Sequence, residues 1–161
     1  MASFENHVLQ AKSNLNFLLL VNKSSQDFWD WQVTTCFYIA VHTVNAHIAK
    51  VGNLHYQTHE AVKNAINPHS VLSICKVEEN IYLDYVKLEG LSRRSRYLCN
   101  ENASQNPDIA HITFDRHLAK AIKLLDRILV YFNNKYTLGL KKNSIVCVDL
   151  KKSPLNLFAI E

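Results

Sequence analysis

Apolar residues recur at helical spacing along most of the chain. In residues 3–23 they form one stripe, made up of Val8, Ala11, Leu15, Leu18 and Leu19. The next segment, from Gln26 to Val51, is apolar on almost every side, a pattern typical of the central, buried helix of a bundle. Gly52 follows this segment and predicts a left-handed stop. The first third of the chain therefore predicts two long helices, the second enclosed by its neighbours.

Two further helices are predicted before residue 100. Thr58 begins the segment THEAVKNAI, which must leave the helix before Pro68, because the residue preceding a proline avoids helical dihedral angles. Residues 76–99 then carry an apolar face at helical spacing, made up of Val77, Ile81, Tyr85, Leu88, Leu91, Ser95 and Leu98. The last turns of this helix are basic, which suits the negative end of the helix dipole.

The remaining residues predict a loop, a long helix and an arm. The polar segment from Asn100 to His111 predicts a mobile loop, after which Thr113 would cap a strongly amphipathic helix that Gly139 ends. Beyond it, SIVCVDL is rich in β-branched residues, and KKSP could turn the chain into LNLFAI.

The whole pattern predicts an all-α fold with one appendage. Residues 1–136 would form an antiparallel bundle of four to five helices, and residues 137–161 a short C-terminal β-hairpin or extended arm. Because an isolated hairpin is only marginally stable in water, the arm should pack on the bundle or on a second subunit.

Composition agrees with one helix-rich domain. The chain has 161 residues, of which only three are Gly and three Pro, and 48% are apolar. Its net charge of +4 permits a nucleic acid or another anionic partner without requiring one. The four cysteines form no CxxC pair, so we expect buried thiols in a reducing compartment. The first residues lack a signal-peptide pattern and the longest apolar run is too short to span a bilayer, so the sequence predicts a cytoplasmic protein.

Common cofactor and metal motifs are missing from the sequence. It contains no glycine-rich phosphate loop, no HExxH, no GxSxG and no Cys/His array at metal spacing. Only His55 and His59 could share a helical face, and His55 is predicted to precede its helix. We therefore expect neither a cofactor nor a metal ion.

Polar residues inside the apolar second helix are the first candidates for chemistry. An imidazole or amide taken out of water must find hydrogen-bond partners, so His42, Asn45 and His47 mark either a core network or a working site. In the second case, His42 and Asn45 would face the basic turn of the fourth helix. His47 points elsewhere and is expected at the surface or at an interface.

The basic turn is the second candidate. Arg93, Arg94 and Arg96 stand beside Tyr97. They can be a solvated helix end, or they can bind phosphates through their guanidinium forks while the tyrosine stacks on a base.

Three segments in order resemble the HEPN family (higher eukaryotes and prokaryotes nucleotide-binding domain). Residues 37–42, FYIAVH, resemble the family's YYAxFH helix. Residues 58–62, THEAV, resemble its THxxV helix, and residues 91–97, LSRRSRY, resemble the turn that ends its later helix. The similarity runs from about Val8 to Tyr136.

The resemblance implies an antiparallel helical bundle, usually homodimeric, that binds or cleaves RNA or binds nucleotides, often in defence or toxin–antitoxin systems. Active ribonucleases of the family carry an arginine followed, after four to six residues, by a histidine. No arginine in this chain has a histidine at that spacing.

The leading hypothesis is therefore an RNA- or nucleotide-binding module, using Arg93, Arg94, Arg96, Tyr97 and Asn45. The alternative is a metal-independent endoribonuclease in which His42 or His111 replaces the missing histidine and acts with Arg96. A third possibility is a structural protein partner that uses the C-terminal arm.

Overall fold

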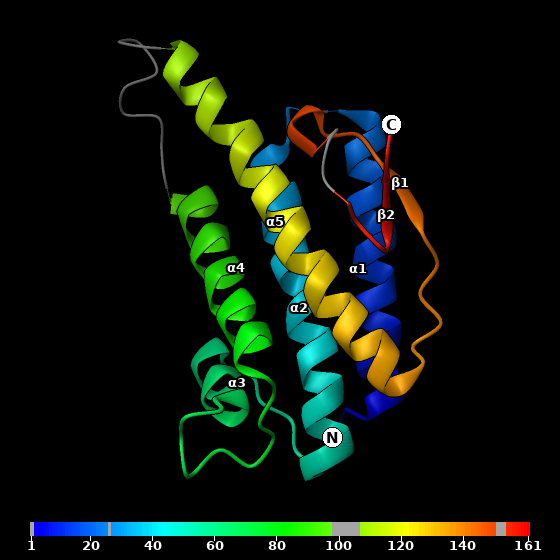
Figure 1. Cartoon of the computed structure of the whole chain (residues 1–161), viewed down its shortest axis with the longest axis vertical. Coiled ribbons are helices and arrows are strands. Elements are labelled where there is room, and N and C mark those ends of the chain that lie inside the picture. The colour runs from blue at the N-terminus through cyan, green and yellow to red at the C-terminus, as the bar shows by residue number, and fades with distance from the viewer. Residues whose placement is uncertain (1, 26, 98–106, 151–153) are drawn as a thin grey trace.

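The computed structural model describes residues 2–25, 27–97, 107–150 and 154–161, and the side chains of all of these except 97 and 107–115. Within these ranges the elements are helices α1 (Phe4–Ser24), α2 (Trp29–Gly52), α3 (His59–Ile66), α4 (Glu79–Tyr97) and α5 (Pro107–Tyr136), then strand β1 (Asn143–Ile145), the 3-10 turn η1 (Val148–Leu150) and strand β2 (Phe158–Ile160). Figure 1 shows the long helices side by side, with the two strands beside α1. The predicted all-α bundle with a short C-terminal arm is confirmed.

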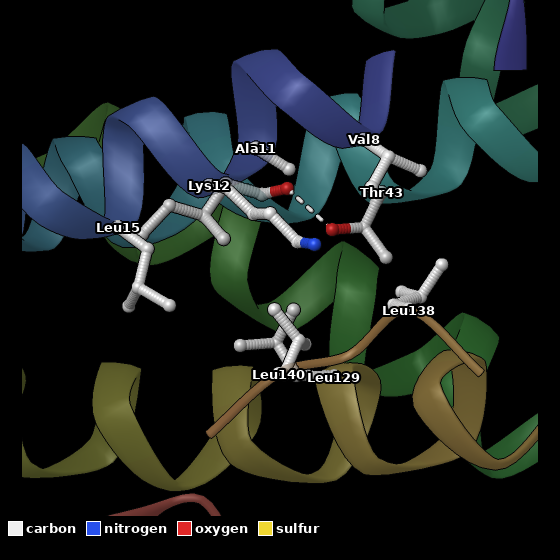
Figure 2. A pocket seen from close by; sticks show the side chains of 9 residues that line it. Val8, Ala11, Lys12, Leu15, Thr43, Leu129, Leu138 and Leu140 are labelled. Atoms are coloured by element: carbon white, nitrogen blue, oxygen red, sulfur yellow. Dashed lines mark hydrogen bonds between the residues drawn. The ribbon is translucent and has the colours of Figure 1, made fainter. Parts of the chain in front are cut away.

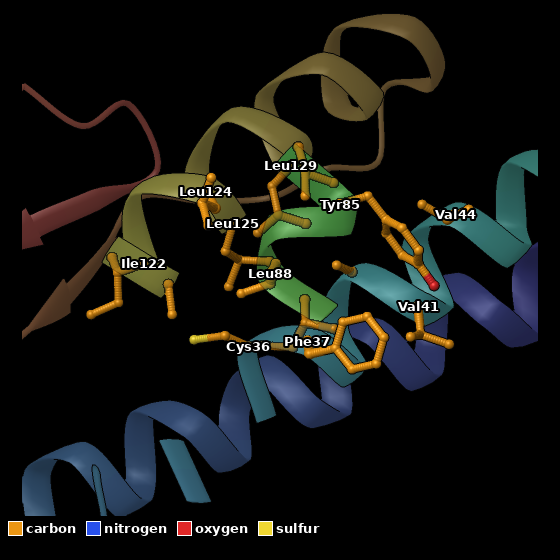
Figure 3. Packing of buried hydrophobic residues seen from close by; sticks show 14 of the residues in the cluster. Cys36, Phe37, Val41, Val44, Tyr85, Leu88, Ile122, Leu124, Leu125 and Leu129 are labelled. Atoms are coloured by element: carbon orange, nitrogen blue, oxygen red, sulfur yellow. The ribbon is translucent and has the colours of Figure 1, made fainter. Parts of the chain in front are cut away.

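Helix α2 is the centre of the bundle, as its apolar pattern predicted. It packs against α1, α3, α4 and α5, and most of its residues are buried. Figure 3 shows Phe37, Val41 and Val44 of α2 meeting Tyr85 and Leu88 of α4, with leucines of α5 close by. Burying this much apolar side-chain surface is the main stabilising contribution to such a bundle.

Two helices begin at a side-chain cap, and of these the cap at Thr58 was predicted. Ser3 and Thr58 accept hydrogen bonds at 3.2 Å from the backbone N–H groups of Asn6 and Ala61, and so begin α1 and α3. Helix α3 ends at Ile66, ahead of Pro68 as predicted.

The left-handed residue after α2 is Asn53, with φ 50°, and not Gly52 as predicted. Asparagine tolerates this conformation better than most residues. Gly52 is the last helical residue, and a Cβ added there would lie 3.0 Å from Cys75 Sγ. The glycine is therefore required for close packing rather than for its dihedral freedom.

Helix α5 begins earlier than predicted. It starts at Pro107, so residues 107–111 are helical, and Thr113 lies inside the helix instead of capping it. Proline suits the first helical position because its fixed φ is already helical and its missing N–H would have no intrahelical partner there. The other residues of the predicted mobile loop lie outside the described residues. The helix ends through a left-handed Thr137, before Gly139 is reached.

The C-terminal arm packs on the bundle of its own chain. Strands β1 and β2 are parallel, with Ser144 opposite Ala159, so the arm is not a hairpin. On the α1 side, Asn22 exchanges hydrogen bonds of 2.8 and 2.9 Å with the backbone of Val146. On the α5 side, the carboxylate of Asp126 accepts from the backbone N–H groups of Asn156 and Leu157. These bonds and the buried Phe158 join the arm to the main core.

Cysteines 36, 75 and 147 are buried free thiols, as predicted, and Cys99 lies outside the described residues. None of the helices in the described ranges is both long enough and apolar enough to cross a membrane.

Candidate functional site: a histidine cluster and a basic face

The two groups of candidate residues lie near opposite ends of the bundle. Arg94, near the end of α4, acts electrostatically on His117 of α5, whose ring lies 6.4 Å from that of Trp29 at the start of α2. His42 stands 13 residues further along α2, about 20 Å away at 1.5 Å per residue. Figure 1 shows α4 running toward the end of the bundle at which α2 begins. Of the two alternatives for His42, the contacts within one chain agree with a core network and not with a position facing the arginine turn.

His42 instead belongs to a histidine cluster, defined as His7, His42 and His55. Nδ1 of His7 lies 3.3 Å from Nδ1 of His42, and Nε2 of His7 lies 3.1 Å from Nδ1 of His55. The rings of His7 and His55 are stacked, with centroids 5.0 Å apart. The cluster ties α1, α2 and the segment after α2 together.

The hydrogen bonds of the cluster limit how many protons it can carry. A neutral imidazole has one donor and one acceptor nitrogen, so a neutral His7 donates to one neighbour and accepts from the other. A single added proton on His7 would let it donate to both. A second added proton, on Nδ1 of His42 or of His55, would place two N–H groups opposite each other, and one hydrogen bond would be lost.

The electrostatic environment favours the neutral form. The pKa of His7 is lowered to about 4, mainly by burial and to a smaller extent by the neighbouring His42 and His55. Burial is also the main cause of the lowered pKa of His42, with His55 second. His7 and His42 are therefore mainly neutral at pH 7.

The cluster does not have the geometry of a metal site. No group of three or more His, Cys, Asp or Glu side chains in the described part of the chain could hold a metal ion. His7 turns its two ring nitrogens toward different partners, so the three lone pairs do not converge on one point. His59 is also separate from His55, since its ring packs edge-on against Phe37.

The other two candidate residues of α2, Asn45 and His47, are buried and hydrogen-bonded. Asn45 is 2% exposed, donates to the carbonyl of Val41 and accepts from the N–H of Tyr56. This position gives Asn45 a structural role in place of the ligand contact expected from the sequence. His47 is 1% exposed, hydrogen-bonded to Tyr136 and to the carbonyl of Cys75, so its predicted surface position is wrong.

The three arginines of the basic turn are exposed but point to different sides of α4. Glu89 pairs with Lys63 of α3, and Arg93 and Arg96 follow Glu89 at helical spacing on that side. Arg94 lies toward α5, where it acts on His117. Nε of Arg96 donates to the carbonyl of Ser92 at 3.3 Å. The side chains of Tyr97 and His111 lie outside the described residues.

On the α5 side, Arg94 is part of a larger basic face, defined as Arg94, Arg116 and Lys120. Burial lowers the pKa of His117, and the charges of Arg94 and Lys120 lower it further. Arg116 and Lys120 lie four residues apart, one turn of α5, and line the same hollow of about 340 Å³. Cations from α4 and α5 therefore meet around His117.

A buried carboxylate holds the two helices of the basic face together. Arg127 of α5 donates from Nε and a terminal nitrogen to both oxygens of Asp84 of α4, at 2.6 and 2.8 Å. The side chain of Asp84 is 8% exposed and that of Arg127 is 54% exposed. Two parallel hydrogen bonds of this kind fix the geometry of both partners.

An apolar cavity between α1, α2 and α5 is shown in Figure 2. Its walls include Val8, Leu15, Leu129 and Leu138, and its volume of about 10 Å³ is close to that needed for one water molecule. It is too small for a substrate or cofactor.

Sequence reasoning missed the members of both sites that lie outside the family-like segments. The cations of α5 recur at Arg116, Lys120, Lys123 and Arg127, a helical spacing that could have been read as one face. Nothing in the spacing of His7, His42 and His55 connects them, because only the folded chain brings α1 beside α2.

No protein family model, curated protein or solved structure matches this chain in the comparisons with known proteins.

Proposed function

We propose that this protein is a HEPN-like module that binds RNA or a nucleotide through the basic face, acting in the cytoplasm as a homodimer. The observation that carries the proposal is that Arg94 and Lys120, from two different helices, act on the same His117. Cations that converge from separate elements form a surface on which a phosphate can contact both helices at once.

The choice of arginine supports a phosphate ligand. A guanidinium group presents several N–H donors in a plane and can hold a phosphate through two of them. Two of the three cations of the basic face are arginines, and Arg93 and Arg96 extend the positive charge to the opposite side of α4. The net charge of +4 adds a general attraction for polyanions.

Binding is favoured over cleavage by the separation of His42 from the arginines. General acid–base catalysis requires the histidine within hydrogen-bond reach of the reacting group, and the described partners of His42 are the histidines His7 and His55 and not the arginines of α4. A role in a defence or toxin–antitoxin system belongs to the proposal through the family resemblance alone.

A metal-independent endoribonuclease is the second candidate. The observation in its favour is the lowered pKa of His42, which keeps that imidazole neutral near pH 7 and able to accept a proton. Within one chain, however, none of the described contacts of His42 is an arginine that could stabilise the phosphate.

Fluorescence anisotropy with a labelled 12-nucleotide oligouridine tests the proposal. We expect the double variant Arg94→Ala/Lys120→Ala to bind at least tenfold more weakly than the wild type at low salt, because each lost phosphate contact removes favourable electrostatic free energy. The wild-type affinity should also fall steeply as salt is raised.

The matched control is Lys50→Ala/Lys76→Ala, which removes the same charge from exposed positions near the other end of α2. Equal losses in the two double variants would mean attraction by net charge alone and would overturn the proposal. Cleavage of the oligonucleotide in EDTA, abolished by His42→Ala, would favour the ribonuclease instead.

A further inference from the structure

A groove continues from the basic face along α5, between this helix and the C-terminal arm. The hollow lined by Arg116, Lys120 and Lys123 also includes Asp149 of η1. A second hollow of about 380 Å³ follows, lined by Lys123, Asp126, Arg127 and residues 154–156. Lys123 lines both hollows, so they lie next to each other along α5, and we name the pair the α5–arm groove.

The described residues of the second hollow are held in place by hydrogen bonds. Asp126 is 2% exposed and binds the backbone N–H groups of Asn156 and Leu157, which fixes the arm against α5. Arg127 is fixed by its bidentate pair with Asp84. A groove with fixed walls loses little conformational entropy when a ligand enters.

The charges inside the groove are mostly positive. Arg116, Lys120, Lys123 and Arg127 stand on one row of α5, at spacings of three or four residues. The carboxylate of Asp126 is buried under the arm, and its charge acts on Arg127 together with that of Asp84, the partner of Arg127. The free positive charge of the groove therefore lies mainly on Arg116, Lys120 and Lys123. Asp149 is the one exposed carboxylate among the described residues that line the two hollows.

We infer that a single RNA strand runs from the basic face into the α5–arm groove, with its phosphates along the row of cations on α5. This inference rests on the proposed function and extends it to the class and path of the ligand. A continuous row of cations suits a linear polyanion, and a positively charged groove that follows one backbone is a common feature of proteins that bind single strands. A duplex would present two backbones to a groove that has one row of cations.

The length of the row sets the number of nucleotides that it can hold. Arg116 and Arg127 are 11 residues apart, which is about 16 Å along the helix. At about 3.4 Å per stacked nucleotide, this length spans roughly five nucleotides, and fewer if the strand is stretched. Affinity for oligouridine should therefore rise with length until both the basic face and the groove are filled.

The experiment measures the affinity of variants for the single-stranded 12-nucleotide oligouridine. We expect Lys123→Ala to weaken binding by three- to tenfold, because it removes the cation shared by the two hollows. Asp149→Asn should tighten binding by two- to threefold, because it removes the repulsive charge. Lys76→Ala, at the other end of the molecule, is the control and should change the affinity by less than twofold.

The possible failures are distinguishable. If Arg94→Ala/Lys120→Ala weakens binding while Lys123→Ala and Asp149→Asn leave it unchanged, the groove is overturned and the proposed function stands. If none of these variants changes the affinity, both fail. Equal affinity for a 12-base-pair duplex, with the same loss in Lys123→Ala, would overturn the assignment to a single strand. Circular dichroism checks that each variant is folded.

Discussion

His7 and His117 show how differently the two ends of this bundle treat an imidazole. Burial is the main cause of a lowered pKa at both residues. The second cause differs: at His7 it is the neighbouring histidines, and at His117 it is the cations Arg94 and Lys120. A lowered histidine pKa therefore accompanies a buried network of histidines at one end and a concentration of exposed positive charge at the other.

The histidine cluster contributes to the stability of the fold, whereas the basic face is suited to binding. The histidine cluster links α1, α2 and the segment after α2, so its hydrogen bonds matter for folding. The basic face and the groove expose charged side chains to solvent, where they contribute little to folding and are available to an anion. Variants at the two ends should therefore change different measured quantities.

Arg127 lines the α5–arm groove and also pairs with the buried carboxylate of Asp84. Its substitution should therefore give the largest effect on stability. Arg127→Ala leaves the carboxylate of Asp84 buried without its ion-pair partner, and we expect the free energy of unfolding to fall by about 2 to 3 kcal/mol. Urea denaturation followed by circular dichroism measures this change.

The control for Arg127 removes both charges. The double variant Asp84→Leu/Arg127→Ala no longer buries an unpaired carboxylate, so we expect it to recover most of the lost stability. A loss of less than about 0.5 kcal/mol in the single variant would show that Asp84 finds another partner, and that Arg127 belongs with the exposed charges.

The second-largest effect on the free energy of unfolding is expected in acid, when His7 is protonated. Because the pKa of His7 is about 4 in the folded chain and 6.5 in the reference state, the unfolded chain binds the proton more tightly. The stabilisation is complete above pH 6.5 and is lost as the pH falls from there toward 4. We expect a loss of about 2 to 3 kcal/mol between pH 7 and pH 4, measured by urea denaturation at each pH.

A substitution at His7 tests whether the cluster causes this pH dependence. His7→Gln removes the most strongly shifted imidazole, so the stability of this variant should depend less on pH, although it starts from a lower value. The same substitution at His69, which is exposed and lies outside the histidine cluster, is the control. Identical pH profiles for wild type and His7→Gln would contradict the account of the cluster.

The smallest effect is expected at the basic face. Arg94→Ala and Lys120→Ala should each change the free energy of unfolding by less than about 0.5 kcal/mol, because exposed charges contribute little to folding. The salt dependence of RNA binding should be reduced by each variant, with the slope of log K against log salt smaller by roughly 0.7 for each lost contact to a single strand. A large loss of stability in either variant would remove the contrast between the two ends.

Much of the fold could be predicted because it depends on local pattern. The apolar stripe of α1, the enclosed α2, the Thr58 cap and the end of α3 before Pro68 each follow from residues a few positions apart. The errors also have local causes. The start of α5 was placed too late because a polar stretch was taken for loop, and the stop after α2 was assigned to Gly52 when the neighbouring Asn53 adopts the left-handed conformation.

The candidate sites were predicted less well because they depend on distant contacts. The arginines of the basic turn stand out in the sequence by their proximity to one another. Their division between two sides of α4 follows from helical geometry, but the meeting of Arg94 with Lys120 depends on how α4 packs against α5. The choice between a core network and a site facing the arginines stayed open for His42, because nothing in its neighbourhood indicates which helix covers it.

The sequence by itself determined the helices, the central place of α2 and the existence of a C-terminal arm, because helical periodicity and apolar burial are encoded over short distances. Only the tertiary structure decided the partners of each polar side chain. It joined His7 to His42 and His55, Asp84 to Arg127, and the arm to Asn22 and Asp126. Hydrogen bonds and charges act over a few ångströms, so residues far apart in the chain acquire a shared chemistry only when packing brings them within that range.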